Sequence, residues 1–172
     1  MELIEYKASM DTLAKIITLG IIVLLVGIGY NSVKEIMDAN GAQTIILVHS
    51  GILVLFVGIL VGSYLYSPQK YEIKNEKLII KRFINSKEIN LNEINEIRKI
   101  NEGEMSGLIR TFGVGGLFGY YGQYHNPTFG DMNLYTTQRK NRILIKTKEG
   151  KKIVISPDDA SIVVKEIKNK IK

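Results

Sequence analysis

The chain contains no cysteine, and its only two histidines are His49 and His125. Without cysteine it can form neither a disulfide nor a thiolate centre, and a zinc site ligated by cysteine is excluded. Two histidines in separate regions are too few for a multi-histidine metal site within one chain. The composition therefore predicts a protein that holds no metal and no cofactor.

Groups of residues that could perform catalysis are also scarce. His125 has Asp131 six residues later, but no serine or cysteine nucleophile lies in the same segment. Asp158 and Asp159 are adjacent, yet their place in the first turn of an expected helix explains them. A glycine-rich segment lacks the G-x-G-x-x-G pattern, because Phe118 stands where the third glycine is needed. We therefore expect that the protein is not an enzyme.

Lysine, arginine, aspartate and glutamate are absent from two long apolar stretches, residues 16–33 and 39–69. A helix that crosses a bilayer needs about 20 consecutive apolar residues. The sequence thus predicts two transmembrane helices, at about 14–33 and 43–66. The chain between them is too short for a domain, so the two helices should form an antiparallel hairpin.

Charge is distributed unevenly between the two parts of the chain. Residues 1–69 carry three Lys and five acidic residues, whereas residues 70–172 carry twenty Lys or Arg and twelve acidic residues. Basic residues flank the outer ends of both apolar stretches, and the connecting loop has only Lys34. Since basic flanks stay on the cytoplasmic side, we expect a multi-pass protein of the cytoplasmic membrane with both termini cytoplasmic. A basic domain held there is attracted to anionic headgroups.

The second part of the chain begins with the alternation that is typical of β-strands. Apolar and polar residues alternate on both sides of the sequence KNEK, which predicts a hairpin that starts at Tyr71. Residues 142–156 predict a second hairpin, in which Gly150 supplies the positive φ of the turn.

The last residues have the pattern of an amphipathic helix. Ser156 and Pro157 are start signals for a helix, and they precede an apolar stripe that includes Val163, Ile167 and Ile171. We expect a helix over residues 158–171 that packs this stripe on the sheet.

Several antiparallel strands, a long glycine-rich segment, further strands and one closing helix are the pattern of a pleckstrin-homology (PH)-like fold. Over about residues 66–170 the chain resembles the bacterial PH-domain family of membrane proteins. The resemblance rests on YEIKNEKLIIKR, INLNEINEI, IRTFGVGGLFGYYGQY, MNLYTTQRKNRILIKT and GKKIVISPDD. It implies a PH-like antiparallel β-barrel or sheet, closed by a C-terminal α-helix, over residues 70–172. Residues 1–69 then form the N-terminal segment with the membrane helices.

Residues 110–130, which we call the Gly-aromatic segment, interleave six glycines with six aromatic residues. Two interpretations stay open: the aromatic residues contact the membrane or a partner, or the segment packs over the barrel or over the helical hairpin, where glycine allows a close approach. The residues expected to make these contacts are Phe118, Tyr120, Tyr121 and Tyr124. Basic residues near the segment could form an anion or headgroup site, namely Arg110, Arg139, Lys140 and Arg142.

These features predict a membrane-anchored binding or regulatory module. It would engage a protein or an anionic lipid headgroup at the cytoplasmic face of the membrane. The alternative is a structural subunit of a larger membrane complex, with the transmembrane hairpin as the contact. The expected partners are the lipid bilayer and another membrane or cytoplasmic protein, whereas nucleic acid is not expected.

Overall fold

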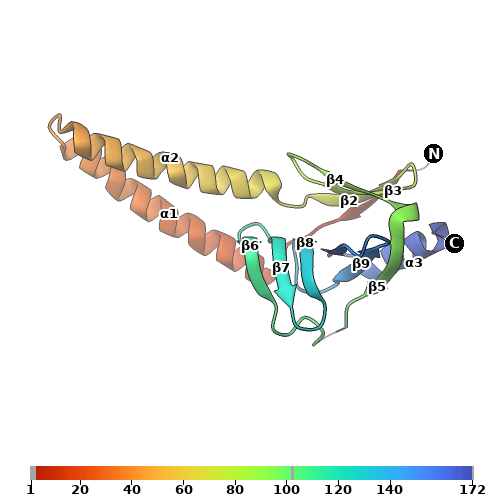
Figure 1. The fold of residues 1–172 in the computed structure, drawn as a ribbon. Helices are drawn as coiled ribbons and strands as arrows, with labels where there is room; N and C mark the ends of the chain where they lie inside the picture. Colours follow the sequence, from red (N-terminus) through yellow and green to blue (C-terminus); the bar gives the residue numbers. More distant parts are fainter. Residues whose placement is uncertain (1–2, 102, 172) are drawn as a thin grey trace.

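The computed structural model describes residues 3–101 and 103–171. Two long helices, α1 (Thr12–Asp38) and α2 (Gln43–Tyr66), project from a domain made mostly of strands (Figure 1). Both helices are long and apolar enough to cross a membrane. The predicted helical hairpin is confirmed, although α1 extends beyond the expected 14–33 at both ends.

Local sequence signals set the ends of the two helices. Asp11 caps α1, because its carboxylate accepts a hydrogen bond of 2.8 Å from the backbone N–H of Ala14. Asn40 and Gly41 adopt positive φ in the turn between the helices. α2 ends before Pro68, which cannot continue a helix.

A four-stranded antiparallel sheet lies at the base of the hairpin, with the order β1-β2-β3-β4. Its strands are β1 (Ile4–Lys7), β2 (Lys70–Lys74), β3 (Lys77–Lys81) and β4 (Lys87–Asn90). β1 precedes α1 in the chain and pairs with β2, so that Tyr6 faces Tyr71. The chain runs from β1 into α1 and from α2 into β2. Because β1 and β2 are paired, both helices are attached to neighbouring strands of this sheet.

A second sheet has six strands in the order β5-β9-β10-β8-β7-β6. A short 3-10 helix, η1 (Leu91–Glu93), leads into it. The strands are β5 (Ile94–Lys99), β6 (Ile109–Gly115), β7 (Tyr120–Asn126), β8 (Gly130–Thr136), β9 (Ile143–Thr147) and β10 (Lys152–Ile155).

Two details of the expected antiparallel barrel need correction. β10 runs parallel to β8. After β8 the chain crosses over to β9 on the other side of β10, and it then returns antiparallel to β9 as β10, between β9 and β8. The two sheets also do not close into a barrel. Their edges β1 and β6 do not pair, and the chain before α1 contacts the end of β8 instead, where Thr137 Oγ1 donates to the carbonyl of Ser9 at 3.0 Å.

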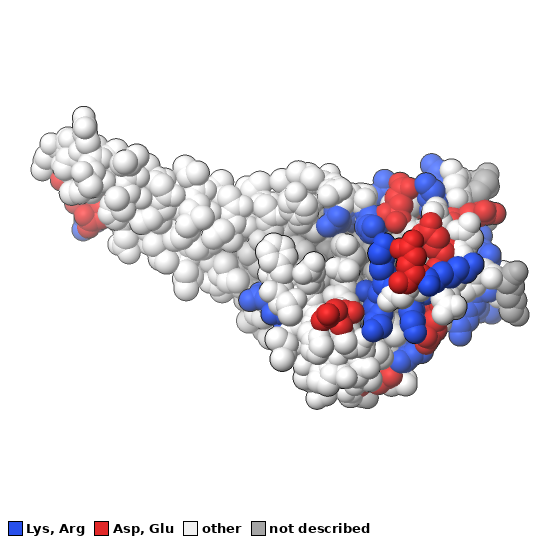
Figure 2. Space-filling view, viewed as in Figure 1, with Lys and Arg blue, Asp and Glu red and all other residues white. Residues whose placement is uncertain are grey.

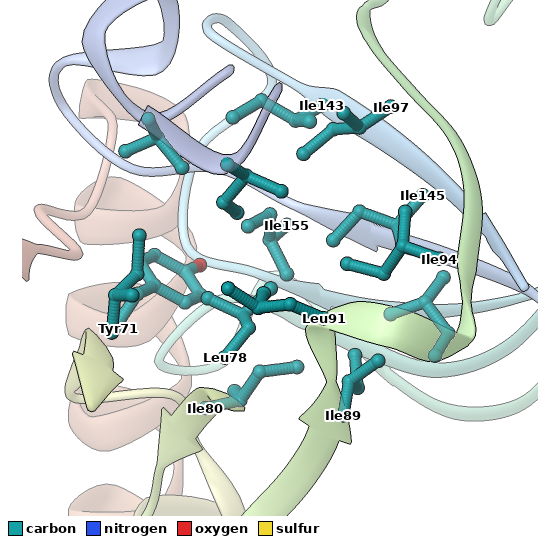
Figure 3. Packing of buried hydrophobic residues seen from close by; sticks show 14 of the residues in the cluster. Tyr71, Leu78, Ile80, Ile89, Leu91, Ile94, Ile97, Ile143, Ile145 and Ile155 are labelled. Carbon is teal, nitrogen blue, oxygen red and sulfur yellow. The ribbon is translucent and has the colours of Figure 1, made fainter. Parts of the chain in front are cut away.

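The hydrophobic core lies between the two sheets and under the final helix, α3 (Ala160–Lys170) (Figure 3). Leu78, Ile80 and Ile155 are fully buried in it, and burial of each such aliphatic side chain stabilises the fold by about 1.5–3 kcal/mol. The predicted closing helix is confirmed, with Val163 and Ile167 fully buried. Ile171 follows the helix and is only partly buried.

The Gly-aromatic segment is not a loop over most of its length, because it forms β6, β7 and the start of β8. Gly113 and Gly122 face each other across β6 and β7, both with positive φ. A Cβ on either would collide with the backbone of the facing strand. These glycines therefore serve the close approach of two strands, which explains why their spacing does not look like a strand pattern.

Candidate functional site

The turn between β6 and β7 lies at the base of the helical hairpin and contacts both helices (Figure 1). Thr18 of α1 donates to the carbonyl of Gly116 at 3.2 Å, and its hydroxyl accepts from the backbone N–H of Phe118 at 2.9 Å. The ring of Phe118 packs edge-on against Tyr64 of α2, with 5.3 Å between centroids. The turn therefore joins the second sheet to α1 and α2.

The four aromatic residues singled out in the sequence point inward. Phe118 is half-buried, and the other three are buried. Each tyrosine hydroxyl donates a hydrogen bond: Tyr120 to Asp11 at 3.2 Å, Tyr121 to the Ser63 carbonyl, and Tyr124 to the Val114 carbonyl at 2.6 Å. The exposed aromatic residue of the segment is instead Phe112, at 74%.

Burial of the tyrosine hydroxyls changes their chemistry. It raises the pKa of Tyr120 and of Tyr121 to about 12, and it also raises the pKa of Tyr124. All three stay neutral near pH 7, so they act as fixed hydrogen-bond donors rather than as proton acceptors.

Three of the four basic residues line one pocket of about 600 Å³ beside the first turns of α1: Arg110, Arg139 and Arg142. Leu13 and Ile17 of α1 form part of its apolar wall. Lys140 does not line this cavity. It lines a neighbouring one of about 570 Å³, which Arg139 and Arg142 border as well.

Asp11 connects this pocket to the start of α1, and sequence reasoning missed it. One carboxylate oxygen accepts from Ala14 and Tyr120, and the other accepts from the backbone N–H of Arg139 at 2.9 Å and from its Nε at 3.3 Å. Burial alone would raise the pKa of Asp11, but these hydrogen bonds outweigh it and hold the pKa below its ordinary value. An aspartate just before an apolar helix was the available signal.

Arg142 is the most buried of the four basic residues, with 7% of its surface exposed. Its guanidinium carbon lies 5.9 Å from the ring centroid of Tyr120. Its Nε has no hydrogen-bond partner, and no ion pair to it occurs within residues 3–101 and 103–171. Burial lowers the pKa of Arg142, but a guanidinium remains protonated in proteins. The pocket thus holds a positive charge that no acidic side chain of the described residues neutralises.

Charged side chains gather on the domain and are almost absent from the helices (Figure 2). A charged group is visible at the distal end of the hairpin, where the sequence has Lys34, Glu35 and Asp38, and α1 also carries Lys15 near its start. The basic pocket therefore lies where the uncharged helices meet the charged domain.

No cluster that could ligate a metal is found among the described residues. His125 Nδ1 lies 2.7 Å from a carboxylate oxygen of Asp131, but both side chains are exposed at facing positions of β7 and β8. This pair is explained by the strand register.

Two sheets closed by a C-terminal helix and mounted on an apolar helical hairpin define a PH-like domain attached to two helices of membrane-spanning length. The sequence pattern of the bacterial PH domain matches residues 69–171, which is more than half of the chain, so the protein belongs to this family. No curated protein and no solved structure matches the chain. PH domains are generally non-catalytic modules that bind proteins or lipids.

Proposed function

We propose that the protein is a membrane-anchored binding module. Its α1–α2 hairpin crosses the cytoplasmic membrane, and its PH-like domain, residues 70–172 with β1 added, binds anionic lipid headgroups at the cytoplasmic face. The observation that carries this proposal is the contact of the β6–β7 turn and of β7 with both helices: the turn is hydrogen-bonded to Thr18 of α1, and Tyr121 of β7 donates to the Ser63 carbonyl of α2. These contacts fix the basic pocket at the point where the helices enter the domain.

Short connections support a fixed position of the domain against the bilayer. Only three residues separate α2 from β2, and four separate β1 from α1. At about 3.3 Å per residue, neither connection can extend much beyond about 13 Å. The domain cannot swing away, and Leu13 and Ile17 bring the pocket to the level of the first turns of α1.

Charge supports the orientation that we propose. Both ends of the hairpin that join the domain carry basic residues, whereas Lys34 is the only basic residue between the two apolar stretches. Each Lys or Arg near an anionic leaflet contributes about 1 kcal/mol of attraction. A cytoplasmic domain would therefore be drawn to the surface against which its helices already hold it.

The groups in the pocket suit binding better than reaction. Guanidinium groups are permanent cations, and the hydroxyls of Tyr120 and Tyr124 are neutral donors already engaged in hydrogen bonds. Such a set recognises an anion but offers no general base. We therefore propose a binding role and no enzymatic one.

A structural role in a larger complex is the second candidate, and one observation favours it. Gly51, Gly58 and Gly62 lie on α2, and within the described ranges none has another part of the chain within 4 Å of the place where a Cβ would stand. Helices in lipid pack closely through small residues. This face of α2 is therefore free to receive a helix of another membrane protein.

Reporter fusions test the orientation. A reporter that is active only in the cytoplasm should work at the C-terminus, and one that is active only outside the cytoplasm should work at Asn40. The opposite pattern would reject the proposed topology.

Lipid retention tests the ligand class. The full chain, purified from mixed vesicles of phosphatidylglycerol and phosphatidylcholine, should retain phosphatidylglycerol preferentially. Equal retention of both lipids would reject the headgroup function. A partner that co-purifies in mild detergent only while the hairpin is present would then favour the structural role.

A further inference from the structure

Hydrogen bonds fix the backbone of Arg142 and of the turn before it. It directly precedes β9, and its carbonyl accepts a hydrogen bond of 2.8 Å from the backbone N–H of Ile100 next to β5. The preceding turn is fixed as well, because Asn141 adopts positive φ and its side chain donates to the Asp158 carbonyl at 2.8 Å. The side chain therefore starts from a rigid point at the pocket wall.

The charges around Arg142 do not balance. Its titratable neighbours are Tyr120, Tyr124, Arg139 and Asp11. Asp11 is the only acid among them, and both of its oxygens are engaged by Ala14, Tyr120 and Arg139. The carboxylate of Asp11 therefore pairs with Arg139 and not with Arg142, and Arg110 adds another positive charge to the same pocket. A buried cation without a partner is destabilising unless an anion completes the site.

The walls of the pocket indicate the chemistry of that anion. Arg110, Arg139 and Arg142 line it, and a guanidinium group binds phosphate through two parallel hydrogen bonds. The apolar part of the wall includes Leu13 and Ile17 of α1 together with Met105 and Leu108, and Tyr120 and Tyr124 also line the pocket. A volume of about 600 Å³ lies within the range of pockets that bind small ligands.

We propose that this pocket binds one anionic lipid, whose phosphate is not neutralised by a cationic headgroup, with the phosphate on Arg142 and an acyl chain along Leu13 and Ile17. The proposal deepens the proposed function and rests on it for the source of the ligand, which is the bilayer in which α1 begins. Inorganic phosphate shares the headgroup chemistry but cannot use the apolar wall.

Thermal unfolding of the full chain in neutral detergent tests the proposal with soluble probes. Dihexanoyl phosphatidic acid should raise the unfolding temperature, and dihexanoyl phosphatidylcholine at the same concentration should not. Arg142→Met should weaken the binding of phosphatidic acid by about tenfold or more, the value of a charge-assisted hydrogen bond. Lys168→Met removes the same charge from an exposed position on α3 and should leave the shift unchanged.

The unliganded variant separates a ligand-binding arginine from a structural one. Without probe, Arg142→Met should unfold at the same temperature as the wild type or higher, because an uncompensated buried charge has been removed. A lower unfolding temperature without probe would overturn the proposal, since the arginine would then stabilise the fold by itself.

The apolar wall has its own test. Leu13→Ser should weaken the binding of phosphatidic acid and leave any response to inorganic phosphate unchanged. Equal responses of the wild type to phosphate and to phosphatidic acid, or no response to either, would overturn the lipid site. The reporter fusions do not depend on any ligand, so a failure of the site and a failure of the proposed topology are distinguishable.

Discussion

Asp11 is the residue through which α1, β7 and the chain after β8 meet. It caps α1 through Ala14, accepts from Tyr120, and holds Arg139 through both the backbone and the side chain. Because these bonds lower its pKa, Asp11 stabilises the folded state fully above its ordinary pKa of 3.8, and this contribution is lost as the pH falls through the lowered folded pKa.

Asp11→Ala should therefore destabilise the protein by about 1–2 kcal/mol near neutral pH, through the loss of the cap and of the ion pair. The difference in unfolding temperature between wild type and variant should shrink below pH 3.8, as Asp11 takes up a proton in the unfolded chain and, at still lower pH, in the folded protein. Asp11→Asn keeps a capping oxygen and should lose less. A difference that stays constant down to the lowest pH at which both fold would contradict this account.

Gly113 has a different role, because it allows two backbones to approach. Gly113→Ala should destabilise the β6–β7 pair strongly, since the added Cβ meets backbone atoms of Tyr121 and Gly122 that cannot move aside. Gly150→Ala is the matched control, with positive φ but open space around it. The control should lose about 1–2 kcal/mol, and Gly113→Ala clearly more. If both variants lost the same free energy of unfolding in chemical denaturation, the positive φ of Gly113 alone, and not the close approach of the strands, would require glycine there.

At the scale of elements, sequence patterns predicted what depends on local chemistry. Absence of charge marked α1 and α2, an apolar stripe marked α3, and a glycine turn marked the β9–β10 hairpin. β1 was missed because four residues before a helix form a strand only when β2, more than sixty residues later, provides its partner. β6 and β7 were missed because their glycines interrupt the alternation on which strand prediction depends.

Only the half of the candidate site that residues 110–142 contribute was predictable from the sequence. The four basic residues were visible as a set, yet the sequence could not show that Lys140 lines a different cavity from Arg110. The other side of the pocket comes from Leu13 and Ile17, about a hundred positions away in the chain. No spacing rule connects a helix start to a distant strand, so this half of the site follows from the tertiary structure alone.

The closing helix offers a paired test of burial. Ile167 is fully buried and Ile162 is 58% exposed on the same helix. Ile167→Asp should remove a large part of the about 5–15 kcal/mol that stabilises a typical domain, because a carboxylate would enter the core without a partner. Ile162→Asp should change the unfolding temperature little. If both variants unfolded alike, α3 would not be the element that covers this core.

The whole molecule is a domain held against two helices at several points. β1 pairs with β2 at the base of the hairpin, the β6–β7 turn is hydrogen-bonded to Thr18, and Tyr121 of β7 donates to the Ser63 carbonyl. A further contact lies at the β3–β4 turn, where the backbone N–H of Ile84 donates to the carbonyl of Leu65 at 3.2 Å. These contacts surround the points where the helices leave the domain, so the domain and the bases of its helices should move together.

This arrangement predicts the depth of the β3–β4 turn in a bilayer. The ring of Phe83 packs 4.9 Å from the ring of Tyr64, near the end of α2, and yet Phe83 is 56% exposed. If α2 spans the membrane, Phe83 lies in the headgroup layer, where aromatic side chains are favourable. Lys74 is exposed at the opposite end of β2, roughly 13 Å further along the strand.

Because the chain has no tryptophan, a single introduced one reports its own surroundings. In the full chain reconstituted into vesicles, Phe83→Trp should emit at shorter wavelength than Lys74→Trp. Lipids that carry bromine near the headgroup end of their acyl chains should quench Phe83→Trp strongly and Lys74→Trp weakly. Equal, weak quenching of both, with the helices inserted, would place the domain away from the bilayer and would contradict the fixed position proposed for it. Strong quenching confined to Phe83→Trp would mean that the β3–β4 turn is a shallow membrane contact beside α2.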